Sequence, residues 1–164
     1  MTDQNTRSSA STKQLQRRFA REFTLKGLYQ WKLTKYSPDM IMQQLNDDPD
    51  YSQMDQIYFR KAFCSIIENI EALHTQLGPL LDREIDIVDP VEYAILLLAS
   101  YELIYQPSVP YRVAINEAIE LAKKFGGSEK SHRYVNGILD RLAQTVRPEE
   151  VAQKRRASAK NKKA

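Results

Sequence analysis

A chain of 164 residues is long enough for one domain with a hydrophobic core. Its single cysteine, Cys64, excludes an intramolecular disulfide and favours a reducing compartment. The longest apolar run, Ala94 to Ala99, is too short to span a bilayer, and the polar N-terminus lacks the apolar core of a signal peptide. We therefore expect a cytoplasmic protein with no membrane partner.

The net charge of +3 is unevenly distributed. Residues 1–35 contain eight Lys/Arg and two acids, a balance of +6. Residues 36–147 contain ten bases and seventeen acids, a balance of −7, and residues 148–164 contain six bases and two acids, a balance of +4. This pattern predicts a nucleic-acid partner for the basic parts and a basic protein partner for the acidic body, although charged tails can also serve solubility alone.

Capping and turn signals divide the first half of the chain into helices. We expect the Ser/Thr/Asn-rich residues 1–12 to be disordered, and a long helix to run from about Lys13 to Thr34. Ser37-Pro38 opens a short second helix, and a third helix follows over about residues 54–77. Apolar residues at helical spacing predict the buried stripe of this third helix: Ile57, Phe59, Phe63, Ile66, Ile67, Ile70, Leu73 and Leu77.

The second half shows the same kinds of signal. Asp89-Pro90 predicts the start of a helix through Tyr105, which contains AILLLA and should be the most buried element. Pro110 opens a helical hairpin, and Gly126-Gly127 forms its turn. We expect an all-α fold, a single compact domain over residues 13–147 with about six to seven helices in two packed three-helix halves. A disordered basic tail over residues 148–164 follows.

One face of the first helix fits single-stranded RNA. At about 100° per residue, that face carries Gln14, Arg18, Arg21, Tyr29 and Lys32, with Arg17 at its edge and aromatic residues opposite. Arginine neutralises phosphates, and an exposed tyrosine can stack an unpaired base. The alternative interpretation is a solvated helix face with Tyr29 at the rim of the core.

The sequence predicts no enzyme, cofactor or metal site. His74 and His132 lie far apart and have no partner at ligand spacing. Cys64 falls on the predicted core stripe, which favours a buried structural thiol. The sequence also lacks a phosphate-binding glycine loop and a nucleophile elbow.

Three motifs occur in order along most of the chain. The first is RRFARE at residues 17–22 followed by LYQW at 28–31, and the second is PVEYAIL at 90–96 followed by YEL at 101–103. The third is VPYRVAINEAIELAKKFGG with SHRYVNGILDRLA, within residues 109–143. Together they resemble the NusB family of bacterial transcription antitermination factors.

This resemblance implies a fold of two three-helix subdomains and an RNA-binding role. It implies pairing with the ribosomal protein NusE, binding of boxA in nascent ribosomal RNA, and a larger complex with NusA, NusG and RNA polymerase. It also implies RNA contacts at Arg17, Arg18, Arg21 and Tyr29, and the shared helix face adds Lys32. Phe19 interrupts the basic run of the family, and the N-terminal extension and lysine-rich tail fall outside its pattern.

For the protein partner we expect a contact from Glu92, near the start of the helix that opens at Pro90. Its carboxylate would meet an Arg or Lys of basic NusE; alternatively, it only favours the helix dipole. Two other functions remain open. One is a helical interaction module without RNA binding. The other is the NusB-like domain of a ribosomal RNA methyltransferase, which would require a truncated chain.

Overall fold

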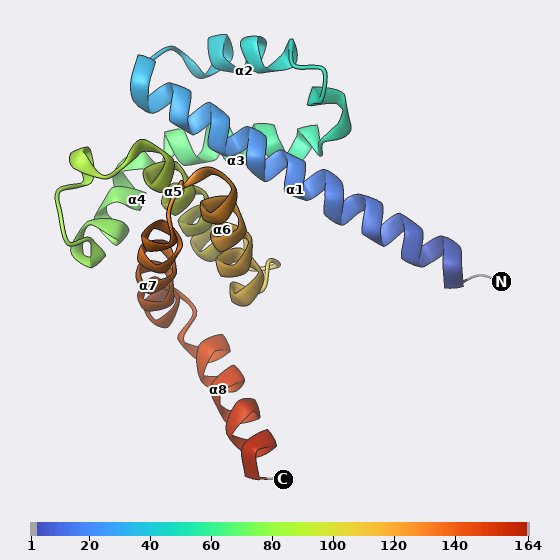
Figure 1. Ribbon diagram of the computed structural model, residues 1–164, viewed down its shortest axis with the longest axis vertical. Coiled ribbons are helices and arrows are strands. Elements are labelled where there is room, and N and C mark those ends of the chain that lie inside the picture. Colours follow the sequence, from blue (N-terminus) through green and yellow to red (C-terminus); the bar gives the residue numbers. More distant parts are fainter. Residues whose placement is uncertain (1–2, 164) are drawn as a thin grey trace. The chain divides into compact units, whose positions relative to one another are not determined.

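Helices make up almost all of the regular structure (Figure 1). The computed structural model describes residues 3–163, and within them it has eight α-helices, three 3-10 helices and no strand. The all-α prediction is therefore confirmed. The chain divides into two compact units, Met1–Ile70 and Glu71–Ala164, which are described separately below.

The first unit contains α1 (Asp3–Thr34), α2 (Pro38–Asn46), the 3-10 helix η1 (Tyr51–Gln53) and α3 (Gln56–Glu68). Short polar side chains start its later helices. Ser37 caps α2, because its Oγ accepts a hydrogen bond from the Met40 N–H at 3.3 Å. Asp55 caps α3 in the same way, accepting from the Tyr58 N–H at 3.0 Å. The predicted three-helix arrangement is confirmed for this half.

An aromatic cluster forms the core of the first unit. Phe23 of α1 meets Tyr51 and Phe59 edge-on, with ring centroids 5.8 and 6.3 Å apart. Phe59 in turn stacks on Phe63 at 5.7 Å. A Cβ at Gly27 would lie 2.9 Å from the Phe63 ring, so only glycine lets α1 approach α3 this closely. These contacts orient α1 within its unit.

The predicted third helix is interrupted. Asn69, with φ −106° and ψ 22°, ends α3, and α4 (Ile70–Leu77) begins at the boundary between the units. The buried stripe is confirmed for Phe59, Phe63, Ile66, Leu73 and Leu77, whereas Ile67 and Ile70 are half-buried. Ile57 is 84% exposed, so its predicted burial is wrong. It lies in the first turn of α3, on the side away from Phe59 and Phe63, and Cys64, two turns later on the same side, is only half-buried.

The second unit continues from α4 through the 3-10 helices η2 (Gly78–Leu80) and η3 (Ile85–Ile87). Its main helices are α5 (Pro90–Tyr105), α6 (Tyr111–Phe125), α7 (Glu129–Val146) and α8 (Pro148–Lys163). This half therefore has five α-helices where the sequence predicts three. Helices α5, α6 and α7 pack against one another. Every residue from Tyr93 to Leu103 in α5 is buried, which confirms α5 as the most buried helix.

Local signals set the starts and turns of these helices. The Asp89 carboxylate caps α5 by accepting from the Val91 and Glu92 N–H groups at 3.0 and 3.2 Å. Between α6 and α7, Gly127 has φ +76°, a left-handed conformation that favours glycine. The predicted hairpin is confirmed, with α6 starting one residue after Pro110.

Both terminal segments are helical within the described residues, where the sequence predicts disorder; the prediction for residues 1–2 and 164 lies outside the described residues. Helix α1 starts at Asp3 instead of about Lys13, and α8 extends over Pro148–Lys163. Neither glycine nor proline interrupts the chain before Gly27 or after Pro148, and Ala, Gln, Lys and Arg are good helix formers. The acids of the first turn of α8 and the bases of its last turn also suit the helix dipole. In the part of the chain that the structure describes, no helix combines the length and apolar character needed to cross a membrane.

Candidate nucleic-acid interface

The solvent-facing side of α1 carries an arginine and a tyrosine three turns apart. Arg18 is exposed, and Tyr29 retains 39% of its surface. Eleven residues separate them, a rise of about 16 Å along the helix. Gln14 is exposed on the same face, and Lys32 is half-buried. Charge at one end and an open aromatic ring at the other give this face the two kinds of group that bind single-stranded RNA.

Arg17 is held in place by α3. Its Nε donates to Asp55 Oδ2 at 3.4 Å, and its guanidinium lies 4.0 Å from the ring centroid of Tyr58. The backbone N–H of Asp55 also donates to the Gln16 carbonyl of α1 at 3.0 Å. Asp55 therefore caps α3, joins it to α1 and orients Arg17. The Arg17 side chain remains 38% exposed, so its guanidinium still reaches solvent.

Arg21 does not lie on the open face where the sequence places it. Only 5% of its surface is exposed, and its guanidinium lies 5.9 Å from the Tyr58 ring centroid. Arg21 is buried because the buried side of α1 is wide. Measured around the helix axis, this side runs from Phe23 past Leu28 to Arg21, an arc of about 160°. Leu25, which falls between Arg18 and Arg21 around the helix axis, is also buried. The solvent-exposed strip of α1 is therefore narrower than the basic face predicted from the sequence.

Glu92 lies in the first turn of α5 and is half-buried. Burial raises the pKa of its carboxyl group, and the nearby carboxylates of Asp89 and Asp82 raise it further. The Ser131 side chain and, to a smaller extent, the positive charge of Arg83 oppose this shift. Three carboxylates against one guanidinium leave the start of α5 negatively charged at neutral pH, which suits a cationic group on a partner.

Sequence reasoning missed the polar cluster formed by Asp82, Arg83 and Tyr134. The Asp82 carboxylate accepts from Arg83 Nε at 2.7 Å and from the Tyr134 hydroxyl at 3.0 Å. The hydrogen bond from Arg83 holds the pKa of Asp82 at about 2. The Arg83 guanidinium also lies 4.9 Å from the Tyr134 ring centroid. Because Asp82 and Tyr134 are 52 positions apart, no local pattern could have joined them.

The histidines and the cysteine show structural contacts. His74 Nε2 lies 2.8 Å from the Tyr93 hydroxyl, whose pKa is raised to about 12, mainly by burial. Burial also raises the pKa of the Cys64 thiol, which disfavours a reactive thiolate. Among the described residues, no group of His, Cys, Asp and Glu is arranged to hold a metal ion.

A model of the NusB family matches residues 18–144, more than three quarters of the chain. The chain belongs to the NusB family. The transcription antitermination protein NusB of Methylobacillus flagellatus is 45% identical over 140 residues, which cover 85% of this chain and 90% of that protein. The NusB of Thiobacillus denitrificans is 44% identical over 135 residues, covering 82% and 92% of the two chains.

Solved NusB structures share the fold. The T. maritima NusB structure superposes with a TM-score of 0.72 at 29% identity and covers 82% of this chain and 96% of that one. A second neighbour, described as antitermination factors NusB and NusE in complex with double-stranded RNA, has a TM-score of 0.65 at 24% identity over 78% of this chain and 96% of its own. The NusB family match starts at Arg18 and ends at Gln144, so Arg17 and the whole of α8 lie outside it.

Proposed function

We propose that this chain is an RNA-binding transcription antitermination factor that pairs with ribosomal protein NusE and binds boxA in nascent ribosomal RNA. The observation that carries the proposal is the exposed side of α1, where Arg18 and Tyr29 stand about 16 Å apart on a helix held against α3. Membership of the NusB family supplies the functional class. The relatives bear the name of a transcription antitermination protein rather than of an enzyme.

The residues of this RNA site have distinct roles in the proposal. Arg18 and Lys32 neutralise phosphates, and Tyr29 stacks an unpaired base. Arg17 contributes a guanidinium whose position is set by Asp55 and Tyr58. Arg21 is buried, so it supports the face through its packing against Tyr58 and is not a primary phosphate ligand.

Pairing with NusE is supported by the structural neighbour described as a NusB–NusE complex and by the charge of this chain. Residues 36–147 carry a balance of −7, which suits a basic ribosomal protein. We place one contact at Glu92, where carboxylates gather at the start of α5. We extend the proposal to a larger assembly with NusA, NusG and RNA polymerase, which would place this protein in the cytoplasm.

The test is binding of a boxA-containing RNA strand by the purified chain, with and without NusE. Arg18→Ala should reduce the slope of log affinity against log salt by about 0.7, the value for one phosphate contact on a single strand. Tyr29→Ala should weaken binding by about 1–3 kcal/mol with little change in slope, whereas Tyr29→Phe, which keeps the ring, should bind nearly as well as the wild type.

Arg112→Ala is the matched control, because Arg112 is an exposed arginine on α6 and is not part of the proposed face on α1. It should leave both affinity and slope unchanged. If the folded Arg18→Ala and Tyr29→Ala variants bound RNA as well as the wild type, the RNA site would not lie on α1. If the chain bound NusE but none of the RNA strands tested, the result would instead favour a helical protein-interaction module.

A further inference from the structure

The C-terminal helix α8 is a part of this molecule that the NusB family does not explain. The family match ends at residue 144, and α8 covers Pro148–Lys163. After Val151 its sequence contains no acidic residue and six basic ones: Lys154, Arg155, Arg156, Lys160, Lys162 and Lys163. All six side chains are exposed. Figure 1 shows α8 leaving the bundle of α5, α6 and α7 and extending away from it.

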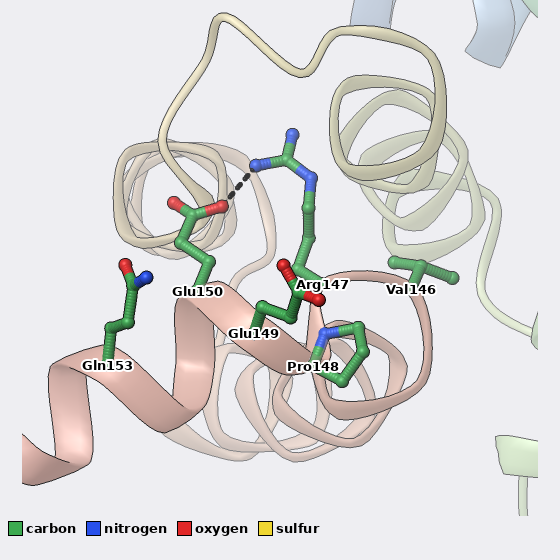
Figure 2. Close-up of a pocket in the computed structure, with 6 residues that line it drawn as sticks. All are labelled: Val146, Arg147, Pro148, Glu149, Glu150 and Gln153. Carbon is green, nitrogen blue, oxygen red and sulfur yellow. Dashed lines mark hydrogen bonds and ion pairs between the residues drawn. The ribbon is translucent and has the colours of Figure 1, made fainter.

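The first turn of α8 is firmly attached to the second unit. Arg147, the residue before the helix, donates to the carbonyls of Leu103, Gln106 and Val109 at 2.7, 2.9 and 3.0 Å. Its Nη1 lies 2.6 Å from Glu150 Oε2, the ion pair drawn in Figure 2. The other oxygen of Glu150 accepts from the Tyr111 N–H at 2.8 Å. The basic turns that follow are therefore presented from a fixed base.

The six basic side chains of α8 are spread over about two thirds of the helix circumference. Taking Lys154 as zero and about 100° per residue, they fall at about 0°, 80°, 100°, 180°, 200° and 240°. The residues between them are Ala157, Ser158, Ala159 and Asn161, all exposed, and Val151 in the anchored turn is the buried apolar side chain of the helix. The segment beyond Gln153 has positive charge on most sides and no apolar stripe.

This distribution decides between kinds of partner. A membrane-surface helix and a helix that docks in a protein groove both need an apolar face, which α8 lacks. A flexible polyanion can approach from any side and gains from charge alone, through release of its counterions. Among polyanions, RNA is the one that a NusB-family protein meets in its proposed function.

We propose that α8 is a second RNA-binding element, which contacts backbone phosphates without preference for base sequence. The boxA site proposed on α1 would select the sequence, and α8 would add affinity for any RNA strand. Because α8 reads only phosphates, its contribution should be the same for boxA RNA and for an RNA without boxA, and it should fall steeply with salt.

The test compares two triple variants of the full chain. One carries Lys160→Gln, Lys162→Gln and Lys163→Gln at the end of α8. The matched control carries Arg112→Gln, Lys123→Gln and Lys124→Gln, three exposed bases on α6. The two variants have the same net charge. Affinity for a 20-nucleotide oligouridine and for a boxA RNA of equal length is measured from 50 to 200 mM salt, and circular dichroism verifies that each variant is folded.

The α8 variant should bind both RNAs more weakly at low salt, with a salt slope reduced by up to about 2, that is, about 0.7 for each phosphate that is no longer neutralised. The α6 control should keep the wild-type slope. Equal slopes for the two variants would overturn the proposal, as would loss of boxA binding alone with oligouridine binding unchanged. A variant that keeps its RNA affinity but no longer binds an acidic protein would also overturn it, in favour of a protein partner.

The oligouridine measurement does not depend on the boxA site. If the chain showed no preference for boxA over oligouridine, the function proposed for α1 would fail. A reduced slope in the α8 variant would still demonstrate phosphate binding there.

Discussion

Arg21 is a buried cation that supports the proposed RNA-binding face of α1 without lying on it. Its guanidinium lies 5.9 Å from the centroid of the Tyr58 ring, and the Arg17 guanidinium lies 4.0 Å from the same centroid. Since only 5% of Arg21 is exposed to solvent, its aliphatic stem contributes packing in addition to the charge of its guanidinium.

We therefore predict that Arg21→Ala lowers the free energy of unfolding by about 1–3 kcal/mol. Arg21→Met, which retains much of the stem, should recover part of that stability. Chemical denaturation measures both values. RNA affinity per folded molecule should change less in Arg21→Ala than in Arg18→Ala; the opposite order would mean that Arg21 reaches the RNA itself.

Glu92 gives a prediction in which stability and partner binding change in opposite directions. The pKa of its carboxyl group is raised in the folded chain, mainly by burial, so the fold disfavours the ionised form. This penalty is present in full above the raised pKa and disappears as the pH falls below the unfolded value of about 4.5, because the carboxyl group is then protonated in both the folded and the unfolded chain.

Glu92→Gln should therefore leave thermal stability unchanged or slightly higher at pH 7 and reduce its variation as the pH falls toward 4. The same variant should weaken NusE binding, most clearly at low salt. Glu129→Gln, an exposed first-turn acid on α7, is the matched control. A drop in stability with NusE binding intact would show that Glu92 acts only on the helix dipole.

At the scale of elements, the end of α7 depends on a single side chain. Arg147 is 10% exposed and bonds to carbonyls at the end of α5 and in the loop before α6, as well as to Glu150 of α8. Carbonyls at the end of a helix lack the N–H donors that a further turn would supply, so the guanidinium satisfies several acceptors at once.

Arg147→Ala should lower the free energy of unfolding by about 2–4 kcal/mol, because it removes the donor that several carbonyls and one carboxylate share. Arg147→Lys should recover less than half of the lost free energy of unfolding, since an ammonium group cannot reproduce the planar arrangement of N–H donors in a guanidinium. Urea titration measures the effect, and Arg133→Ala on the exposed side of α7 serves as the control. A value for Arg147→Ala within about 0.5 kcal/mol of wild type would contradict this role.

Helix ends could be predicted from the sequence where local capping and turn signals mark them. The burial of individual side chains could not be predicted where it depends on packing against distant helices. Asp89-Pro90 and Gly126-Gly127 mark helix ends through the geometry of their own backbones, so α5 and the α6–α7 turn lie where expected. Arg21 and Ile57 were misplaced because periodicity alone does not show how many neighbours a helix has. The ion pair of Arg17 with Asp55 could not be predicted from a local sequence pattern, because Asp55 lies 38 residues further along the chain.

At the scale of the whole molecule, the opposite charges of the N-terminal and middle segments predict coupling between partners. RNA must approach a chain whose middle segment carries −7, and a basic protein bound to that segment would remove the repulsion. NusE should therefore raise RNA affinity at least about fivefold at 50 mM salt, and less at 200 mM, where screening is stronger.

By thermodynamic linkage, RNA should raise NusE affinity by the same factor. Titrations in both orders, at both salt concentrations, measure the coupling. A factor that does not change with salt would mean that the two partners communicate through shape or direct contact rather than through charge.

The division of the chain at Ile70 has a consequence for how the protein is made. Each compact unit is a continuous stretch of sequence, and the break at Asn69 coincides with the boundary between them. Helical units with local contacts fold quickly, and chains emerge from the ribosome N-terminus first. The unit that carries Arg18 and Tyr29 can therefore begin to fold while the segments that form α5, α6 and α7 are still being synthesised.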